Sequence, residues 1–445
     1  MPNYIKKEEV NYPYLDKPVS IYTYSSGHKI AIAKKDSHMA NISTWAKTGS
    51  INENSENNGV SHFLEHLMFK GTTKYKAGVF DRTLESKGGI INAATWKDYT
   101  YYYVTIPKRA FDTAIKMHAD MMVDPIIPEE EVGPAFKFGE EIPEQKRERY
   151  VVIEEIRMGK DNNWRKVYSA LNNAMYEKHP YKREVIGSEE IIGSIPRDEI
   201  MRYYQTFYSP DNLTTIVVGD FEDDEILEKL ENEFKFKDNP GIEKCKSDER
   251  IPEIIIKNPT DIELKGNVNT GYLMLGFLCD SAKNLKETIA LDIISIILGE
   301  GKSSRLYSRF IENPSEPYVY QIETCHYQFK DGDNFFIEAT FDPAKKDALM
   351  TELKEELDKL AQISSEELNK AKKRARVNFA QEAETVSDIA DSIGYYMTVC
   401  EDLNPASKYL DTLNEIDTLY ISQTAQKYLN RNVCSSCTLM PQGDR

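Results

Sequence analysis

The chain has 445 residues, of which 40% are hydrophobic and 29% charged, which is typical of a folded protein with two or three domains and excludes a disordered or fibrous chain. Its formal net charge of −17 disfavours nucleic acid as a partner, because binding to phosphates depends on Lys and Arg side chains. Six cysteines are too few for a disulfide framework, and no apolar run is long enough to span a bilayer, so we expect no membrane segment.

The N-terminal stretch is polar and charged. MPNYIKKEEVNYPYLDKP lacks the apolar core of a signal peptide and the Arg-rich, acid-poor composition of a transit peptide. We therefore expect a cytoplasmic location, and export stays open if an N-terminal signal has been removed from this sequence.

The first half of the chain alternates between strand and helix patterns. A strand pattern is followed by a helix, a pair of alternating strands, four helices and a closing strand, which together form one α+β module. These elements are expected at 41–50, 59–72, 88–106, 110–122, 149–159, 164–176, 198–208 and 212–221.

The same order of elements recurs in the second half, so the sequence predicts two tandem copies of one fold. Each copy is expected to be an antiparallel sheet packed with helices. The expected elements lie at 271–280, 286–298, 319–329, 334–342, 347–360, 365–398, 417–429 and 432–440. The predicted domains are residues 1–240 and 256–445, joined by a polar linker at 241–255 that contains Pro and Gly.

The stretch GVSHFLEHLMFKGT, residues 59–72, places two histidines and a glutamate in an otherwise apolar helix. His62 and His66 are one turn apart on the same face, and Glu65 lies beside them. Because apolar residues surround them, we expect the histidines to face the interior, where polar side chains need partners. Zinc binds imidazole and carboxylate groups, and a catalytic site has three protein ligands and a water. The pattern predicts His62 and His66 as metal ligands and Glu65 as a general base, against the alternative of two histidines on a surface helix.

A third ligand has to come from another segment. In EQKRERYVVIEEIRMGK, residues 144–160, Glu148 and Glu155 are seven residues apart on one helical face, whereas Glu154 lies off that face. Taken alone, this segment favours a charged helix exposed to solvent. The second copy has no His/Glu set on its first helix, so one metal site per chain is expected.

Five motifs in order carry a resemblance to a known family: HFLEHLMFKGT, NAATWKDYTYYYV, ERYVVIEEI, HPYKREVIG and YSPDNLTTIVVGDF. With them the chain resembles the pitrilysin-like inverzincin zinc metallopeptidases. It is most similar to their two-domain branch, which includes the mitochondrial processing peptidase subunits. The resemblance covers essentially the whole chain, including its tandem repeat.

The resemblance implies a role for each matching residue. His62, His66 and Glu155 match the zinc ligands, Glu65 matches the general base, and Glu148 matches an acidic residue that supports the catalytic site. Asn92 and Ala93 fall on the edge strand where the family binds substrate. An extended peptide would add there as a further strand, so peptides or unfolded segments are the expected substrates.

Two segments depart from the family pattern. Residues 129–145 contain an acidic insertion of about a dozen residues, which we expect to be a solvated surface loop rather than a substrate contact. The family also uses an Arg and a Tyr seven residues apart in the second domain to hold substrate and stabilise the oxyanion. Here Tyr318 matches the Tyr, but Ile311 stands at the position of the Arg.

The predicted function is a zinc endopeptidase with one zinc ion per chain, and the alternative is a non-catalytic core or scaffold subunit of a peptidase-like complex. A zinc hydrolase acting on other substrates fits the metal motif but not the edge-strand match. The family resemblance implies that a second homologous two-domain chain completes the catalytic chamber. Because Ile311 replaces the Arg, we expect a heterodimer with a partner that carries it, and a homodimer stays open.

Overall fold

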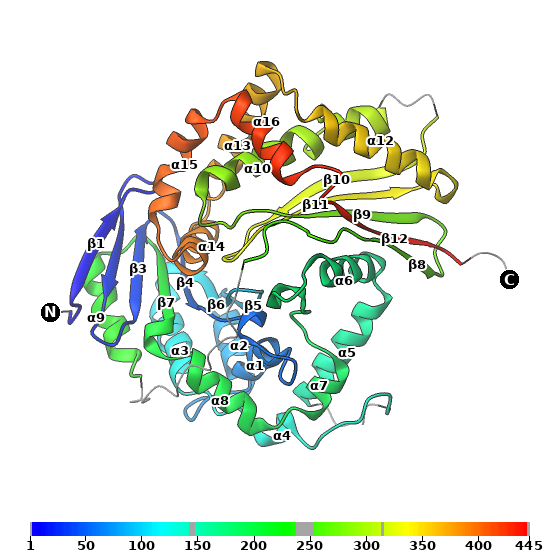
Figure 1. Ribbon diagram of the computed structural model, residues 1–445. Coiled ribbons are helices and arrows are strands. Elements are labelled where there is room, and N and C mark those ends of the chain that lie inside the picture. The colour runs from blue at the N-terminus through cyan, green and yellow to red at the C-terminus, as the bar shows by residue number, and fades with distance from the viewer. Residues whose placement is uncertain (1, 142–146, 237–251, 313–315, 443–445) are drawn as a thin grey trace. The chain divides into compact units, whose positions relative to one another are not determined.

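The chain forms two compact units, each built on one β-sheet (Figure 1). The computed structural model describes residues 2–141, 147–236, 252–312 and 316–442. None of the helices in these ranges combines the length and apolar character that crossing a bilayer requires. The first unit comprises Met1–Arg157, Arg183–Glu249 and Ala380–Ser407, and the second comprises Met158–Lys182, Arg250–Phe379 and Lys408–Arg445.

The first unit contains a seven-stranded sheet with the strand order β1-β2-β3-β7-β4-β6-β5. Neighbouring strands are antiparallel except for β3 and β7, which pair in parallel. β6 alternates strictly between buried and half-buried residues, as its sequence predicts. The strands are β1 (Lys6–Val10), β2 (Val19–Thr23), β3 (Lys29–Lys34), β4 (Met39–Ala46), β5 (Ile90–Thr95), β6 (Thr100–Pro107) and β7 (Leu213–Gly219).

Helices cover this sheet, and the helix that carries His62 contacts the edge strand β5 and its neighbour β6. The insertion contributes a short helix of its own, α4. The helices of the first half are α1 (Val60–Met68), α2 (Val79–Glu85), α3 (Phe111–Val123), α4 (Glu129–Val132), α5 (Glu148–Asp161), α6 (Asn163–Met175), α7 (Glu189–Ser194), α8 (Arg197–Phe207) and α9 (Asp223–Glu233).

The second unit contains a five-stranded sheet with the order β10-β11-β9-β12-β8. Its strands are β8 (Asp261–Gly266), β9 (Gly271–Leu278), β10 (Val319–Tyr327), β11 (Asn334–Phe341) and β12 (Ser435–Pro441). The helices of the second half are α10 (Leu285–Gly299), α11 (Arg305–Tyr307), α12 (Lys346–Lys359), α13 (Ser365–Gln381), α14 (Val386–Tyr395), α15 (Asn404–Glu415) and α16 (Thr418–Tyr428). A π-helical turn, η5 (Ser308–Glu312), follows α11.

The two sheets repeat one topology. Five strands of the first sheet, in the order β3-β7-β4-β6-β5, correspond to β8-β12-β9-β11-β10 of the second. In both sheets the first two of these strands are parallel, and the three following pairs are antiparallel. The predicted α+β fold of two homologous sheet-and-helix domains is confirmed, with the correction that each sheet contains one parallel pair. By this order α10 corresponds to α1, β10 to β5, and α13 to α5.

The compact units do not follow the division into 1–240 and 256–445 strictly. α6, from the first half, packs on β9 and β12 of the second sheet, and α14, from the second half, packs on β4 and β7 of the first (Figure 1). Residues 158–182 and 380–407 therefore belong to the unit built on the other half of the sequence. Most of the predicted linker, 241–255, lies outside the described residues.

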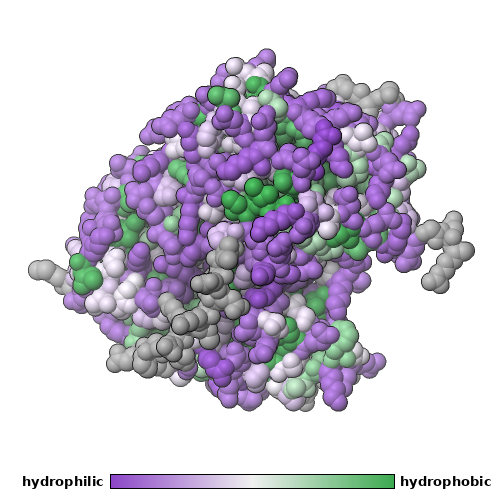
Figure 2. Space-filling model, viewed as in Figure 1, coloured by the Kyte–Doolittle hydropathy of each residue, from purple (hydrophilic) through white to green (hydrophobic). Residues whose placement is uncertain are grey.

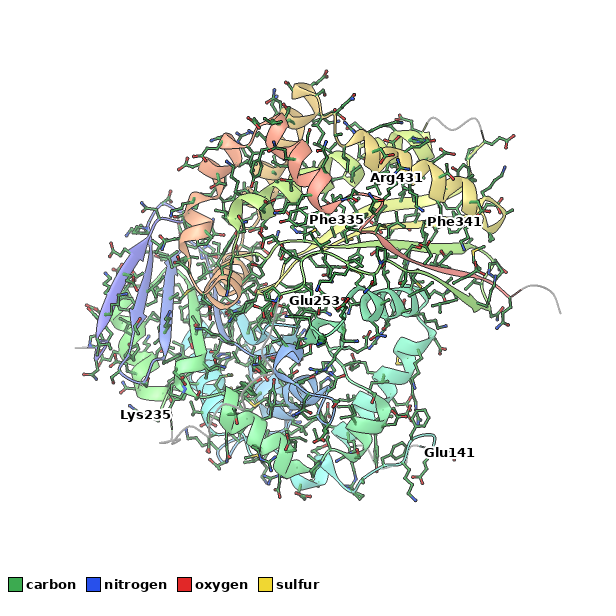
Figure 3. The ribbon with its side chains drawn as sticks, viewed as in Figure 1. Glu141, Lys235, Glu253, Phe335, Phe341 and Arg431 are labelled. Carbon is green, nitrogen blue, oxygen red and sulfur yellow. The ribbon has the colours of Figure 1, made fainter. Side chains whose placement is uncertain are left out.

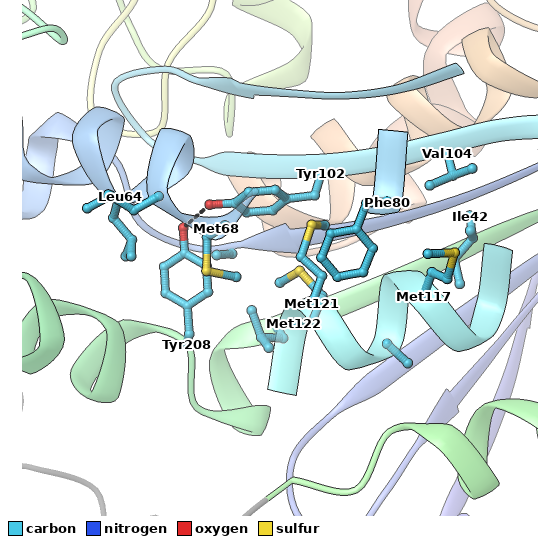
Figure 4. Packing of buried hydrophobic residues seen from close by; sticks show 14 of the residues in the cluster. Ile42, Leu64, Met68, Phe80, Tyr102, Val104, Met117, Met121, Met122 and Tyr208 are labelled. Atoms are coloured by element: carbon cyan, nitrogen blue, oxygen red, sulfur yellow. Dashed lines mark hydrogen bonds between the residues drawn. The ribbon is translucent and has the colours of Figure 1, made fainter. Parts of the chain in front are cut away.

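The core of the first unit lies between its sheet and the surrounding helices. Leu64 and Met68 of α1 point into this core, close to Tyr102 of β6 and Tyr208 after α8 (Figure 4). The two tyrosine hydroxyls are 2.9 Å apart and hydrogen-bonded. One face of α1 is thereby fixed against the sheet by apolar packing, and its other face is left for polar groups.

In the second unit, the fully buried side chains of Phe335 and Phe341 lie along β11 (Figure 3). The carboxylate of Glu253, labelled in the same figure, accepts the backbone N–H groups of Glu177, Lys178 and His179. The segment that follows α6 is tied to this unit by these bonds. Hydrophilic residues cover most of the face seen in Figure 2, in keeping with the large negative charge.

A buried histidine joins two carboxylates in the second unit. Nδ1 of His326 on β10 is 2.6 Å from Oδ1 of Asp292 on α10, and its Nε2 is 3.2 Å from Oδ2 of Asp333. Burial lowers the pKa of His326, but the two carboxylates outweigh it and raise the pKa to about 9. Protonated His326 therefore stabilises the fold, because it compensates buried negative charge.

We expect the unfolding temperature to fall as the pH rises from about 6.5 to about 9. The raised pKa means that the stabilisation by His326 is complete below its ordinary pKa of 6.5 and is lost as the pH passes about 9. Thermal unfolding across this range in the wild type and in His326→Gln checks it, and the variant should lack this fall. Exposed His38 provides the control, since His38→Gln should leave the pH dependence unchanged.

Candidate metal centre

The helix that carries the two histidines is fixed at its start by a buried glutamate. The carboxylate of Glu53 accepts the backbone N–H of Gly59 at 2.8 Å and that of Ser61 at 2.9 Å, and it also accepts the Ser61 hydroxyl. A negative charge at a helix N-terminus satisfies free N–H groups and interacts favourably with the helix dipole. Gly59 has a φ of 97°, and a Cβ there would lie 2.6 Å from the carbonyl oxygen of Ile186, so only glycine fits.

The polar residues of α1 lie on the face away from the core. Phe63, Leu64, Leu67 and Met68 are fully buried, but the side chains of His62 and His66 are 14% and 21% exposed. The expectation that the histidines face the interior is met in part: both side chains are largely buried, but they lie opposite the apolar packing and border an accessible site.

His62, His66 and Glu155 come together although they belong to two helices. One ligand atom from each lies within 4.8 Å of the other two. Oε2 of Glu155 is 3.8 Å from Nε2 of His62 and 3.6 Å from Nε2 of His66. Two ligands of a tetrahedral zinc ion, with bonds of about 2.0–2.2 Å, lie about 3.3–3.6 Å apart. The donor set and spacing therefore fit one zinc ion after small side-chain adjustments.

The orientation of His66 is set by Glu148. Nδ1 of His66 is 2.9 Å from Oε1 of Glu148, whose other oxygen pairs with Lys70. If Nδ1 carries the proton, Nε2 is left as the ligand atom facing Glu155. Burial raises the pKa of Glu148, but the bonds to His66 and Lys70 outweigh it, so the pKa lies below its usual value. Glu148 is thus held as a carboxylate.

Glu65 connects the centre to the edge of the first sheet. The hydroxyl of Thr95, the last residue of β5, donates to Oε2 of Glu65 at 2.5 Å. Burial raises the pKa of Glu65, and the Thr95 hydrogen bond and nearby His66 only partly offset it. A carboxylate whose pKa is moved towards neutrality is suited to proton transfer.

Asn92 and Ala93 lie on β5, which is an outer strand of the seven-stranded sheet. Among the described strands β5 pairs with β6 alone. The backbone N–H of Ala93 donates to Oδ1 of Asn92 at 2.9 Å. This edge is therefore available for a further strand, two residues before the threonine that binds Glu65.

A buried arginine positions α5, which carries Glu148 and Glu155. Arg149 is only 1% exposed, and its guanidinium donates to the carbonyl oxygens of Val132, Ile192, Gly193 and Ile195. Burial lowers the pKa of Arg149 to about 10, which leaves it charged at neutral pH. These bonds connect the start of α5 to α4 and to the end of α7.

The acidic insertion is more than a solvated loop. Residues 142–146 lie outside the described part of the chain, but Val132 and Phe136 are buried. The ring centroids of Phe136 and Tyr150 are 5.7 Å apart. Oε2 of Glu131 also accepts the backbone N–H of Glu148 at 3.0 Å. The expectation of a solvated loop is corrected for 129–136, because apolar side chains between the acidic ones bury themselves against α5.

Tyr318 belongs to the second unit, where its hydroxyl donates to Oε1 of Glu352 at 2.7 Å. Ile311 lies in η5, and the nearby Arg309 pairs with Glu352, Glu355 and Glu356. A role for Tyr318 in holding substrate stays a prediction and would require it to exchange Glu352 for substrate.

Sequence reasoning missed four residues that shape the centre: Glu53, Lys70, Thr95 and Arg149. Thr95 lies inside the quoted NAATWKDYT motif, so its place next to Asn92 and Ala93 was a usable signal. Glu53 and Arg149 act on backbone groups of distant segments, and no spacing in the sequence marks such contacts.

Comparison with known proteins identifies the family of the chain. Residues 29–189 match the family described as insulinase, peptidase family M16, and residues 194–375 match the peptidase M16 inactive domain. The chain belongs to peptidase family M16. The predicted membership of the pitrilysin-like metallopeptidases is thereby confirmed, and the candidate ligand residues lie in the part of the chain that matches the insulinase description.

Its relatives include several proteins named as zinc proteases. The chain is 28% identical to zinc protease PqqE of Helicobacter pylori, with 96% of this chain and 94% of that protein covered. The crystal structure of a protease from Helicobacter pylori, 25% identical, covers 98% of this chain and 100% of that one with a TM-score of 0.81. Mitochondrial-processing peptidase subunit beta of Dictyostelium discoideum is 26% identical, over 52% of this chain and 46% of that protein.

Glu155→Gln should weaken zinc binding by at least about 10- to 100-fold, the loss that is typical even of residues that only support ligands. Glu154→Gln is the matched control, because Glu154 is exposed and pairs with Arg157. Competition of each purified variant with a chromogenic chelator gives the two affinities. A loss of zinc in Glu154→Gln with none in Glu155→Gln would contradict the assignment of the ligand.

Proposed function

We propose that this chain is a zinc-dependent endopeptidase that cleaves peptides or unfolded segments added as a strand to β5. The observation that supports it most is the contact between Thr95 and Glu65. Through this contact the open edge of the sheet ends at the carboxylate beside the metal-binding group. A peptide extended along β5 would therefore pass the candidate general base.

His62, His66 and Glu155 would hold the zinc ion. When bound, zinc supplies a Lewis acid that polarises a carbonyl group and brings the pKa of a water to about 7. Glu148 keeps His66 oriented, and Lys70 keeps Glu148 charged. Glu65 accepts the proton of the attacking water and can return it to the leaving amine. The N–H of Ala93, which now donates to Asn92, would donate to the substrate backbone.

A non-catalytic scaffold is the alternative, and the description of residues 194–375 as an inactive domain is compatible with it. The intact donor set and the buried Glu65 favour catalysis, because a scaffold has no need of either. Within the described residues the donor set occurs in the first unit, which supports one zinc ion per chain.

Glu65→Gln should retain zinc and lose peptidase activity by about 10²- to 10⁴-fold, because the amide cannot take up a proton. Zinc content and turnover of a quenched peptide are measured in the same preparation. Glu56→Gln, an exposed glutamate nearby, serves as the control and should behave as the wild type. Full turnover in Glu65→Gln would exclude the proposed base, and zinc-loaded wild type without turnover on any peptide would favour the scaffold.

The assembly is part of the proposal. Relatives named as subunit beta of a processing peptidase support a second homologous chain. The side chain of Ile311 has no hydrogen-bond donor for the substrate carbonyl. A partner chain that carries an arginine at this position is therefore favoured over a second copy of this chain. A cytoplasmic location likewise stays a prediction.

The isolated chain should be weakly active, since loss of one oxyanion donor lowers the rate by about 10²- to 10³-fold. Addition of a homologue that carries the Arg and Tyr should restore activity and form a heterodimer. Mass in solution and peptide turnover, measured with and without that homologue, check both points. A homodimer with robust turnover by itself would reject the heterodimer.

A further inference from the structure

The second unit contains a counterpart of the metal centre that is built from different chemistry. In the first unit, the edge-strand residue Thr95 binds Glu65 of α1. In the second, Thr324 of the edge strand β10 binds Ser295 of α10, with its hydroxyl 2.9 Å from both the side-chain and the backbone oxygen. By this contact Ser295 corresponds to Glu65, and Ile296, the next residue, corresponds to His66.

A cavity of about 550 Å³ lies at this counterpart position, bounded by α10, the loop after it and α13. This volume is within the range of sites that bind small organic ligands. Ile296 and Ile297 of α10 and Ala371 and Val377 of α13 form an apolar wall. Val377 is 47% exposed, so the wall reaches the mouth of the cavity.

Two polar groups at the cavity, the Ser304 hydroxyl and the Lys373 ammonium, have no partner in the part of the chain that the structure describes. Ser304 lines it and is only 3% exposed, and its hydroxyl has no hydrogen-bond partner among the described residues. Among the described residues the ammonium group of Lys373 forms no ion pair. Its neighbours have partners, since Arg374 pairs with Glu300 and Lys370 binds Ser303. A buried hydroxyl without a partner is costly, and a ligand oxygen would satisfy it.

We propose that this cavity binds the C-terminal residue of a peptide, with an apolar side chain and a free carboxylate. The side chain would lie on the isoleucine and valine wall, and the carboxylate would pair with Lys373. Ser304 would donate to an oxygen of the ligand, and the carboxylate of Glu300 at the rim can accept a backbone N–H. Because the rim carries both a carboxylate and an ammonium group, it suits a peptide better than a fatty acid, which has no N–H group to donate to Glu300.

The probes are N-acetyl-Ala-Ala-Leu, its C-terminal amide, and decanoate. Isothermal titration of the full chain in the presence of a chelator measures binding without cleavage, so the outcome does not depend on the proposed peptidase activity. The free acid should bind at least about tenfold more tightly than the amide, because a charge-assisted bond to Lys373 is lost in the amide.

Lys373→Glu should weaken binding of the acid by at least about tenfold, and so should Val377→Asp at the exposed mouth. Lys372→Glu is the control: it makes the same charge change on the same helix, but Lys372 donates to the carbonyl oxygen of Asn414 and does not line the cavity. Equal binding of acid and amide, no binding of the acid, or binding unaffected by Lys373→Glu overturns the proposal. Decanoate binding more tightly than the peptide, with the same dependence on Lys373, would replace the peptide by a lipid-like acid.

Discussion

The candidate metal centre depends on the position of α5, and a buried guanidinium fixes α5 against α4 and the end of α7. Arg149 lies one residue after Glu148 and six before Glu155, so any shift of its contacts moves both carboxylates. Four carbonyl oxygens from two other segments surround it. Hydrogen bonds to a charged group contribute about 1.5–3 kcal/mol each, and an unpaired buried charge would cost more than any of them. The arginine therefore has essentially one stable position, and α5 follows it.

The sequence predicted those residues of the candidate metal centre that lie at helical spacing along one segment. His62, Glu65 and His66 lie within a single helix, and the seven-residue spacing of Glu148 and Glu155 predicted that both lie on one face of a second helix, where both approach His66. Bringing the two helices together required the family resemblance, because no local pattern contains a contact over 89 residues. The insertion was misjudged for a related reason: its acidic residues dominate the composition, whereas Val132 and Phe136 decide how it packs.

α6 and α14 each pack on the sheet formed by the other half of the sequence, and the order of the predicted elements did not indicate this. Each helix has an apolar face, and its sequence predicts that this face is buried, but not against which sheet. In the second unit Gly276 of β9 lies directly under α6: a Cβ there would be 2.5 Å from the sulfur of Met175 and 3.0 Å from Leu171. Gly394 of α14 lies as closely over Trp45 of β4. These glycines allow each helix to approach its sheet closely. The sequence does not show which helix and sheet meet at them, because the contacts join distant segments.

The two copies also show how one architecture supports different sites. In each unit a threonine on the edge strand binds the helix beside it, so the backbone arrangement is retained whatever side chains follow. In α1 the residue after the bonded position is His66, and a carboxylate on the opposing helix completes the candidate cation site. In α10 that residue is Ile296, and α13 presents Lys370, Lys373 and Arg374 instead. Because a cation site needs converging lone pairs and an anion site needs donors, the proposed sites would differ in the charge of their ligands through the exchange of only a few side chains.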